Sequence, residues 1–192
     1  MRKVRHSAPG ILIGEPALEC WEDLRFPAVG INLAGAGGEP TRDSTTGYLE
    51  FPATGTTTIV VHPQLPHGWK EGSSVSPHVH WRKKTAGAGN VIWQLEYEWS
   101  GIGDVETDSL TTVPGGTVVG GDDGSAKRHL LTSFGSIAMT GKKVSTMGLL
   151  RISRLGSDGG DTYAGVVQLK EFDIHIQIDS LGSEYEYDKQ DD

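Results

Sequence analysis

The sequence predicts an all-β fold, an antiparallel β-sandwich that is jelly-roll-like and carries an irregular N-terminal arm. The first observation is composition, because 27 Gly and 9 Pro give a turn-rich chain without long stretches of helix-forming residues. The second is the alternation of apolar and polar residues in several short segments bounded by turn residues. About eight or nine short strands joined by turns are typical of a sandwich or barrel, and at 192 residues we expect a jelly roll.

The chain divides into three predicted parts. Residues 1–46 lack a sustained period and form the arm, residues 47–182 form the sandwich body, and residues 183–192 form an acidic tail. The arm contains apolar residues that are unusual in a free linker and are expected to pack on the body or on a neighbouring molecule. The candidate interface residues of the arm are Trp21, Leu24 and Phe26, together with the basic Arg2, Lys3 and Arg5.

The predicted strands lie in the body, and turn residues mark where each begins and ends. The predicted segments are 48–51, 57–62, 74–83, 91–99, 110–113, 127–131, 134–139, 148–154 and 163–179, with a loop at 117–125. In the last strand, Val167 and Leu169 are out of phase with Phe172 and Ile174. A one-residue change of phase predicts a β-bulge near Lys170.

The block from Ser74 to Trp99 is predicted to be a central hairpin with its turn at 87–90. Alternation in its first strand places Val79 and Trp81 on one face and His78 and His80 on the other. The first face is apolar, so we expect it to build the core and the two histidines to point outward or toward an interface. The second strand places Trp93 and Trp99 on one face; strict alternation favours their burial in the core, whereas exposure would give a carbohydrate-binding platform.

A Gly-x5-His-x-His string runs from Gly72 to His80 and matches the opening of the cupin metal motif. Two histidines two residues apart on a strand point the same way and can bind one metal ion. However, a cupin site lies inside the barrel, and here the expected glutamate and a second motif are missing. His175 lies on the polar face of its strand, and it would join the other two histidines only if the last strand neighbours theirs.

Other candidate chemistry is weak. The turns at 122–124 and 158–161 are rich in Asp but match no full calcium loop, and Asp is a default turn residue. Glu96 and Glu98 share a strand face, as solvated carboxylates also do, and Cys20 is expected to be a packed thiol. Nucleophile, phosphate-loop and dinucleotide motifs are missing. We therefore assign no catalytic, cofactor-binding or metal-binding residue and expect no enzyme and no cofactor.

Charge and hydropathy narrow the possible partners. The net charge of −8 argues against nucleic acid as a partner, since phosphate contacts need clustered Lys and Arg. No apolar run reaches the length of a membrane-spanning helix, and the basic N-terminus lacks the apolar segment of a secretory signal. The single cysteine excludes an internal disulfide. We expect neither nucleic acid nor a membrane as a partner.

The chain resembles a group of small, mostly uncharacterised proteins encoded by tailed bacteriophages and prophages. The segments that carry the resemblance are WEDLRFP (21–27), PHGWKEG (66–72), PHVHW (77–81), NVIWQLEY (90–97), SFG (133–135), MTG (139–141), RLG (154–156), DTY (161–163) and EFDIH (171–175). The group offers no activity that could be transferred to this chain. What the resemblance implies is a virion structural protein, made in the bacterial cytoplasm and assembled with copies of itself and with other virion proteins of the capsid, portal or tail.

The sequence therefore predicts a non-enzymatic virion component that either decorates the capsid or belongs to the tail and fibre apparatus. Two alternatives stay open. One is a carbohydrate-binding module of a phage fibre, and the other is a cupin-like metalloprotein that uses His78 and His80.

Overall fold

The protein is an all-β sandwich of two antiparallel sheets in a computed structural model that describes residues 20–33, 35, 37–120, 124–187 and 189. The strands are β1 (Cys20–Pro27), β2 (Thr41–Arg42), β3 (Leu49–Phe51), β4 (Thr56–Val61), β5 (Ser76–Lys83), β6 (Val91–Ser100), β7 (Thr111–Gly120), β8 (Leu130–Ser133), β9 (Met147–Leu155) and β10 (Val167–Ile178). One short 3-10 helix, η1 (Ala28–Gly30), follows β1. The described residues form no helix that is long and apolar enough to cross a membrane.

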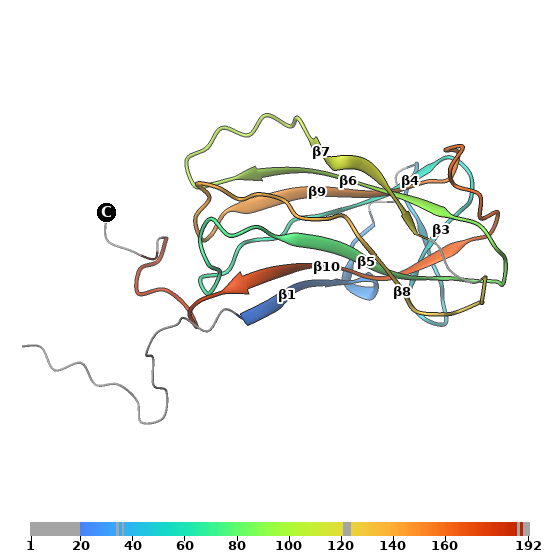
Figure 1. Ribbon diagram of the computed structural model, residues 1–192, viewed down its shortest axis with the longest axis horizontal. Helices are drawn as coiled ribbons and strands as arrows, with labels where there is room; N and C mark the ends of the chain where they lie inside the picture. The colour runs from blue at the N-terminus through green and yellow to red at the C-terminus, as the bar shows by residue number, and fades with distance from the viewer. Residues whose placement is uncertain (1–19, 34, 36, 121–123, 188, 190–192) are drawn as a thin grey trace, which may run out of the picture.

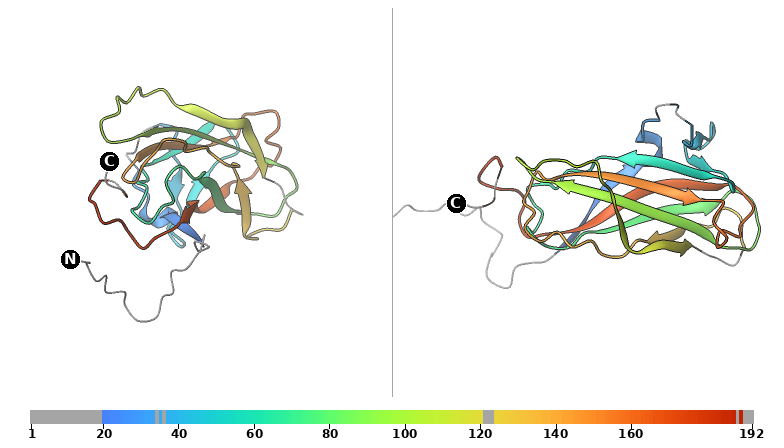
Figure 2. Two further views of the ribbon diagram at one scale, coloured as in Figure 1. Left: turned by 60° about the vertical axis from the view of Figure 1, so that its left-hand side comes forward. Right: turned by 90° about the horizontal axis from the view of Figure 1, so that it is seen from above.

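The two sheets have the strand order of a jelly roll. The first sheet runs β2-β3-β10-β5-β8, and the second runs β4-β9-β6-β7. From β3 onward the chain therefore crosses between the sheets at every connection except that from β6 to β7. Figure 1 shows the layers stacked, and the second view in Figure 2 shows their elongated outline. The predicted fold class is confirmed.

Part of the expected arm belongs to the first sheet. β1 pairs with β10 over its whole length, from Cys20 opposite Ile178 to Pro27 opposite Glu171. The pairing divides the predicted interface residues, because neighbouring residues of a strand face opposite ways. Leu24 and Phe26 pack against the core, whereas Trp21 lies on the outer face and is 59% exposed. Arg2, Lys3 and Arg5 lie outside the described residues.

Alternating apolar residues fill the space between the sheets, as predicted. Trp81 of the first sheet and Trp93 of the second are fully buried, and their ring centroids lie 6.0 Å apart across the core. Phe51 lies edge-on to Trp93 at 5.2 Å. Trp99 is also buried, so neither Trp93 nor Trp99 offers an exposed platform for a sugar.

The predicted hairpin at 74–99 is wrong. β5 pairs with β10 and β8, whereas β6 pairs with β7 and β9, so the two strands face each other across the core. The turn at 87–90 carries the chain from one sheet to the other, and the buried Lys83 donates hydrogen bonds to the carbonyls of Gly87 and Gly89. Two amphipathic strands can lie side by side in one sheet and share an apolar face, or lie in opposite sheets with their apolar faces in contact. Alternation has the same pattern in both arrangements and therefore could not distinguish them.

Other boundaries moved as well. β7 continues to Gly120 through part of the predicted loop, and a single strand, β8, replaces the two pieces expected at 127–131 and 134–139. The predicted bulge is confirmed, since the register of β10 against β5 shifts between Leu169 and Glu171. The bulge keeps both Leu169 and Phe172 in the core and turns the intervening polar side chains outward.

Candidate functional site

A group of histidines and one aspartate gathers on the outer face of the first sheet, away from the apolar core. The histidine–aspartate cluster consists of His78 and His80 from β5 and Asp173 and His175 from β10. It forms because β10 pairs with β5 and places Asp173 opposite His78. The two histidines point outward as predicted, but His78 and Asp173 are buried, with 4% and 5% of their side chains exposed.

The acceptor and donor atoms of the cluster converge closely. His78 Nε2 lies 3.1 Å from His80 Nε2 and in contact with Asp173 Oδ1, and His80 Nε2 lies 3.2 Å from Asp173 Oδ2. Potential ligand atoms of His78, Asp173 and His175 all lie within 4.8 Å of one another. Asp173 Oδ1 is buried and accepts no hydrogen bond of good geometry, although it touches His78.

One ring nitrogen of each of the three histidines has a partner outside the cluster. His78 Nδ1 lies 3.5 Å from the carbonyl oxygen of Ser76, and His80 Nδ1 lies 2.7 Å from His129 Nε2. His175 Nε2 lies 3.1 Å from Asp23 Oδ1 of β1. These partners can fix the orientation of each ring and the position of its proton.

Electrostatics favour a positive charge within the cluster. Burial lowers the pKa of His78, but its close contact with the negatively charged Asp173 carboxylate outweighs burial, so the pKa lies above its usual value. At His129, by contrast, burial and the charges of Lys170 and His80 lower the pKa. A neutral His129 can accept the proton of His80 Nδ1, which leaves His80 Nε2 as an acceptor that faces Asp173.

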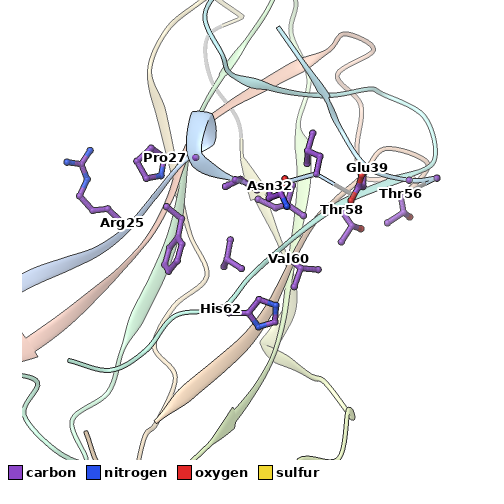
Figure 3. Close-up of a pocket in the computed structure, with 16 residues that line it drawn as sticks. Arg25, Pro27, Asn32, Glu39, Thr56, Thr58, Val60 and His62 are labelled. Carbon is purple, nitrogen blue, oxygen red and sulfur yellow. The ribbon is translucent and has the colours of Figure 1, made fainter. Parts of the chain in front are cut away.

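A separate groove of about 810 Å³ opens beside β1, between the edges of the two sheets. Figure 3 shows Arg25 and Pro27 of β1 on one side and Thr56, Thr58 and Val60 of β4 on the other. β4 is the terminal strand of its sheet, and among the strands that the structure describes β1 pairs with β10 alone. Among the described residues, the outer edge of β4 makes one backbone hydrogen bond on this side, which Thr58 N–H donates to the Gly38 carbonyl.

The aspartates of the turn at 158–161, which were candidates for a calcium site, have partners within the protein. Asp161 is fully buried against Arg154 and is not available to a calcium ion. Asp158 accepts a hydrogen bond from the backbone of Gly160 within its own turn. The turn at 122–124 lies largely outside the described residues. Cys20 is exposed and not packed as expected.

The paired glutamates on β6 are also engaged. Glu96 forms an ion pair with Arg151, with 2.7 Å between Oε2 and Nη2. Glu98 accepts two hydrogen bonds from Thr107, which lower its pKa. The two carboxylates therefore serve separate partners on the outer face of the second sheet.

Sequence reasoning missed Asp173. The strand pattern placed it on the polar face of the last strand beside His175, but nothing local indicates that it lies opposite His78. That position depends on the pairing of strands far apart in sequence and on the bulge at Leu169. The one usable signal was the condition stated for His175, that the last strand neighbours the strand of His78, and this condition is met.

Comparisons with known proteins give no family. No family model matches the chain, and no curated protein matches it. Similar solved structures are the insecticidal delta-endotoxin Cry8Ea1 from Bacillus thuringiensis (14% identity, TM-score 0.43, 80% of this chain and 24% of that one) and dimeric latent PorU from Porphyromonas gingivalis (14%, 0.37, 86% and 14%). A third is the arabinose-bound MgGH51 α-L-arabinofuranosidase (9%, 0.39, 82% and 23%). The chain spans a quarter or less of each of these chains, and likenesses at this level carry no argument about function.

Proposed function

We propose that the protein is a non-enzymatic structural component of a bacteriophage virion and that it assembles with its neighbours through β1. It either decorates the capsid or belongs to the tail and fibre apparatus. Its partners are copies of itself and other virion proteins. The resemblance of its sequence segments to phage-encoded proteins supports this function.

The observation that carries the proposal is the position of Trp21. The indole is 59% exposed on the outer face of an edge strand, where it contributes little to the core. Tryptophan is enriched among the residues that dominate protein interfaces, because a rigid aromatic ring buries a large area at low entropic cost. A second exposed apolar side chain, Val60, lies on β4 across the groove from the other end of β1. Within the described part of the chain β1 pairs on one side, with β10, and unpaired strand edges favour association.

The test is incorporation into particles. Virions are purified from cells that supply either the wild-type protein or the Trp21→Ala variant, and copies are counted against the major capsid protein by quantitative mass spectrometry. We expect at least about a tenfold loss of incorporation for Trp21→Ala, as for a hot-spot residue, with the fold intact. Hundreds of copies per virion would place the protein on the capsid, and about six to eighteen would place it in the tail or neck, by the symmetry of those assemblies.

The matched control is Ile102→Ala, which removes a comparably exposed apolar side chain from a turn that follows β6. This variant is expected to be incorporated normally. Phe26→Ala is a poor probe, because Phe26 packs on Phe172 with 6.1 Å between ring centroids and its loss would weaken the sandwich itself. Wild-type levels of the Trp21→Ala variant in particles would refute assembly through β1, and virions without the wild-type protein would refute the virion role.

A further inference from the structure

We propose that the histidine–aspartate cluster is a binding site for a divalent transition metal ion, with Zn²⁺ as the best match. The ligands are His78 and His80 through Nε2, the Asp173 carboxylate, and His175 as the fourth ligand through Nδ1. This site goes beyond the assembly role proposed above and does not depend on it. It also differs from a cupin site, because it lies on the outer face of a sheet and includes an aspartate.

The first argument is the spacing of the ligand atoms. A tetrahedral zinc ion with bonds of about 2.0–2.1 Å to nitrogen and oxygen places neighbouring ligand atoms about 3.3 Å apart. His78 Nε2 and His80 Nε2 are 3.1 Å apart, and His80 Nε2 and Asp173 Oδ2 are 3.2 Å apart. Two of the three edges of one face of a coordination tetrahedron are therefore already in place, and the third edge joins His78 to the carboxylate that it touches.

The second argument is the position of the protons on the imidazole rings of the cluster. If His78 and His80 each carry their proton on Nδ1, toward Ser76 and His129, both Nε2 atoms present lone pairs to each other and to Asp173. Converging lone pairs beside a buried carboxylate repel unless a proton or a metal ion lies between them. The buried Asp173 Oδ1, which accepts no well-formed hydrogen bond, points to the same requirement.

The third argument is the outer ring of partners. Metal-binding histidines generally donate their second N–H to a carboxylate, a carbonyl or another acceptor, which fixes the ring and raises its basicity. Each of the three histidines has such a partner: the Ser76 carbonyl, His129 and Asp23. The contact of His175 Nε2 with Asp23 leaves Nδ1 to bind the ion.

The donor set selects the metal. Three imidazoles and one carboxylate suit Zn²⁺ and its neighbours among the transition metals, whereas Ca²⁺ and Mg²⁺ require mostly oxygen ligands. With four protein ligands the site is of the closed, structural type. The ion would cross-link β5 and β10 and, through Asp23 and His175, would also hold β1.

The experiment titrates untagged, EDTA-treated full-length protein with ZnCl₂ by calorimetry at neutral pH and with CoCl₂ by visible absorption. We expect one Zn²⁺ per chain with a micromolar or lower Kd and the strong visible bands of tetrahedral Co²⁺ with nitrogen ligands. Zinc at about 100 times Kd should raise Tm by about 5–10 °C. Binding weaker than about 100 μM, or Co²⁺ spectra of an octahedral ion, would overturn the proposal.

Variants separate this site from chance binding to surface histidines. Asp173→Asn and His78→Ala are each expected to weaken zinc binding by more than about 100-fold, and Asp23→Asn, which removes only an outer partner, by about 10-fold. His62→Ala removes an exposed histidine of the β1–β4 groove and should leave the Kd unchanged. If His78→Ala fails to fold, the nearly isosteric Asp173→Asn decides, and unchanged binding in that variant refutes the site.

Discussion

Two groups of ionisable side chains differ in how completely their polar atoms are paired: the Arg154–Asp161 pair between the sheets and the histidine–aspartate cluster on the outer face. Both side chains of the first pair are 0% exposed. The guanidinium donates two hydrogen bonds to the Asp161 carboxylate and three to the backbone carbonyls of Phe51, Tyr163 and Gly165. All five of its N–H groups therefore have acceptors.

In the histidine–aspartate cluster, by contrast, acceptors outnumber donors. It brings acceptors together, with two imidazole nitrogens and a carboxylate converging and one carboxylate oxygen poorly paired. Burial of a charge is tolerated when it is fully paired, as at Arg154, and is costly when it is not. The fully paired Arg154 and Asp161 stabilise the fold as they stand, whereas the incomplete pairing in the cluster is the feature on which the proposed metal site rests.

The largest expected effect comes from breaking the complete pair. Arg154→Met should lower the free energy of unfolding by about 3–5 kcal/mol, because it leaves the Asp161 carboxylate buried without its partner. The matched control on the same strand is Arg151→Met, whose ion pair with Glu96 is partly exposed and should be worth about 0.2–1 kcal/mol. Urea denaturation followed by tryptophan fluorescence measures both. Equal losses for the two variants would contradict the distinction.

Sequence predicted the faces of the strands but not the pairings between them. Alternation identified Trp81, Trp93 and Phe172 as core residues, and the change of phase located the bulge at Leu169–Glu171, because both signals are local. The false hairpin at 74–99 and the missed Asp173 share one cause. Which strand lies beside which is decided by contacts between segments far apart in the chain, and periodicity carries no information about them.

The burial of Arg154 shows the same limit for single residues. It stands at the end of a strand, and Asp161 stands in a Gly-rich turn that the sequence offered as a calcium candidate. Asp is a default turn residue, so the sequence indicated an ordinary turn and not a buried ion pair. Only the fold brings the Asp161 carboxylate to the guanidinium and to the backbone N–H of Ile92, both of which donate hydrogen bonds to it.

An intermediate effect is expected when both partners of each group become apolar. In EDTA, the double change His78→Leu with Asp173→Leu should alter the free energy of unfolding by less than about 1 kcal/mol or should stabilise the fold, since it removes a group that repels itself. The double change Arg154→Met with Asp161→Leu should lower the free energy of unfolding by at least about 2 kcal/mol more than the double change in the cluster does. The reason is that three backbone carbonyls lose the donor Arg154 and the Ile92 N–H loses its acceptor. Urea denaturation of the two double variants decides, and equal costs would show that the cluster is as well paired as Arg154.

The smallest effect concerns a partly exposed carboxylate, that of Asp43, near the surface. Asp43 Oδ1 accepts hydrogen bonds from the Thr46 backbone and hydroxyl and from the Thr45 backbone, and these lower its pKa to about 2. A lowered pKa means that the folded state favours the carboxylate. The resulting stabilisation is present above the ordinary value of 3.8 and is lost as the pH falls through about 2.

Thr46→Val removes one donor, the hydroxyl, and should move the pKa of Asp43 upward from about 2 toward 3.8 and reduce this acid-dependent stabilisation. Thr45→Val is the matched control, because Thr45 contributes only its backbone N–H to this carboxylate, and it should leave the pKa unchanged. Carboxyl ¹³C NMR titration between pH 1.5 and about 6 measures both values, a range set by the usual pKa of Asp and the lowered one. An unchanged pKa in Thr46→Val would mean that the backbone donors and the charge of Lys84 hold the carboxylate ionised without the hydroxyl. The expected rise would show that the hydroxyl contributes, and that the loss of one donor costs less at this partly exposed carboxylate than at either buried group.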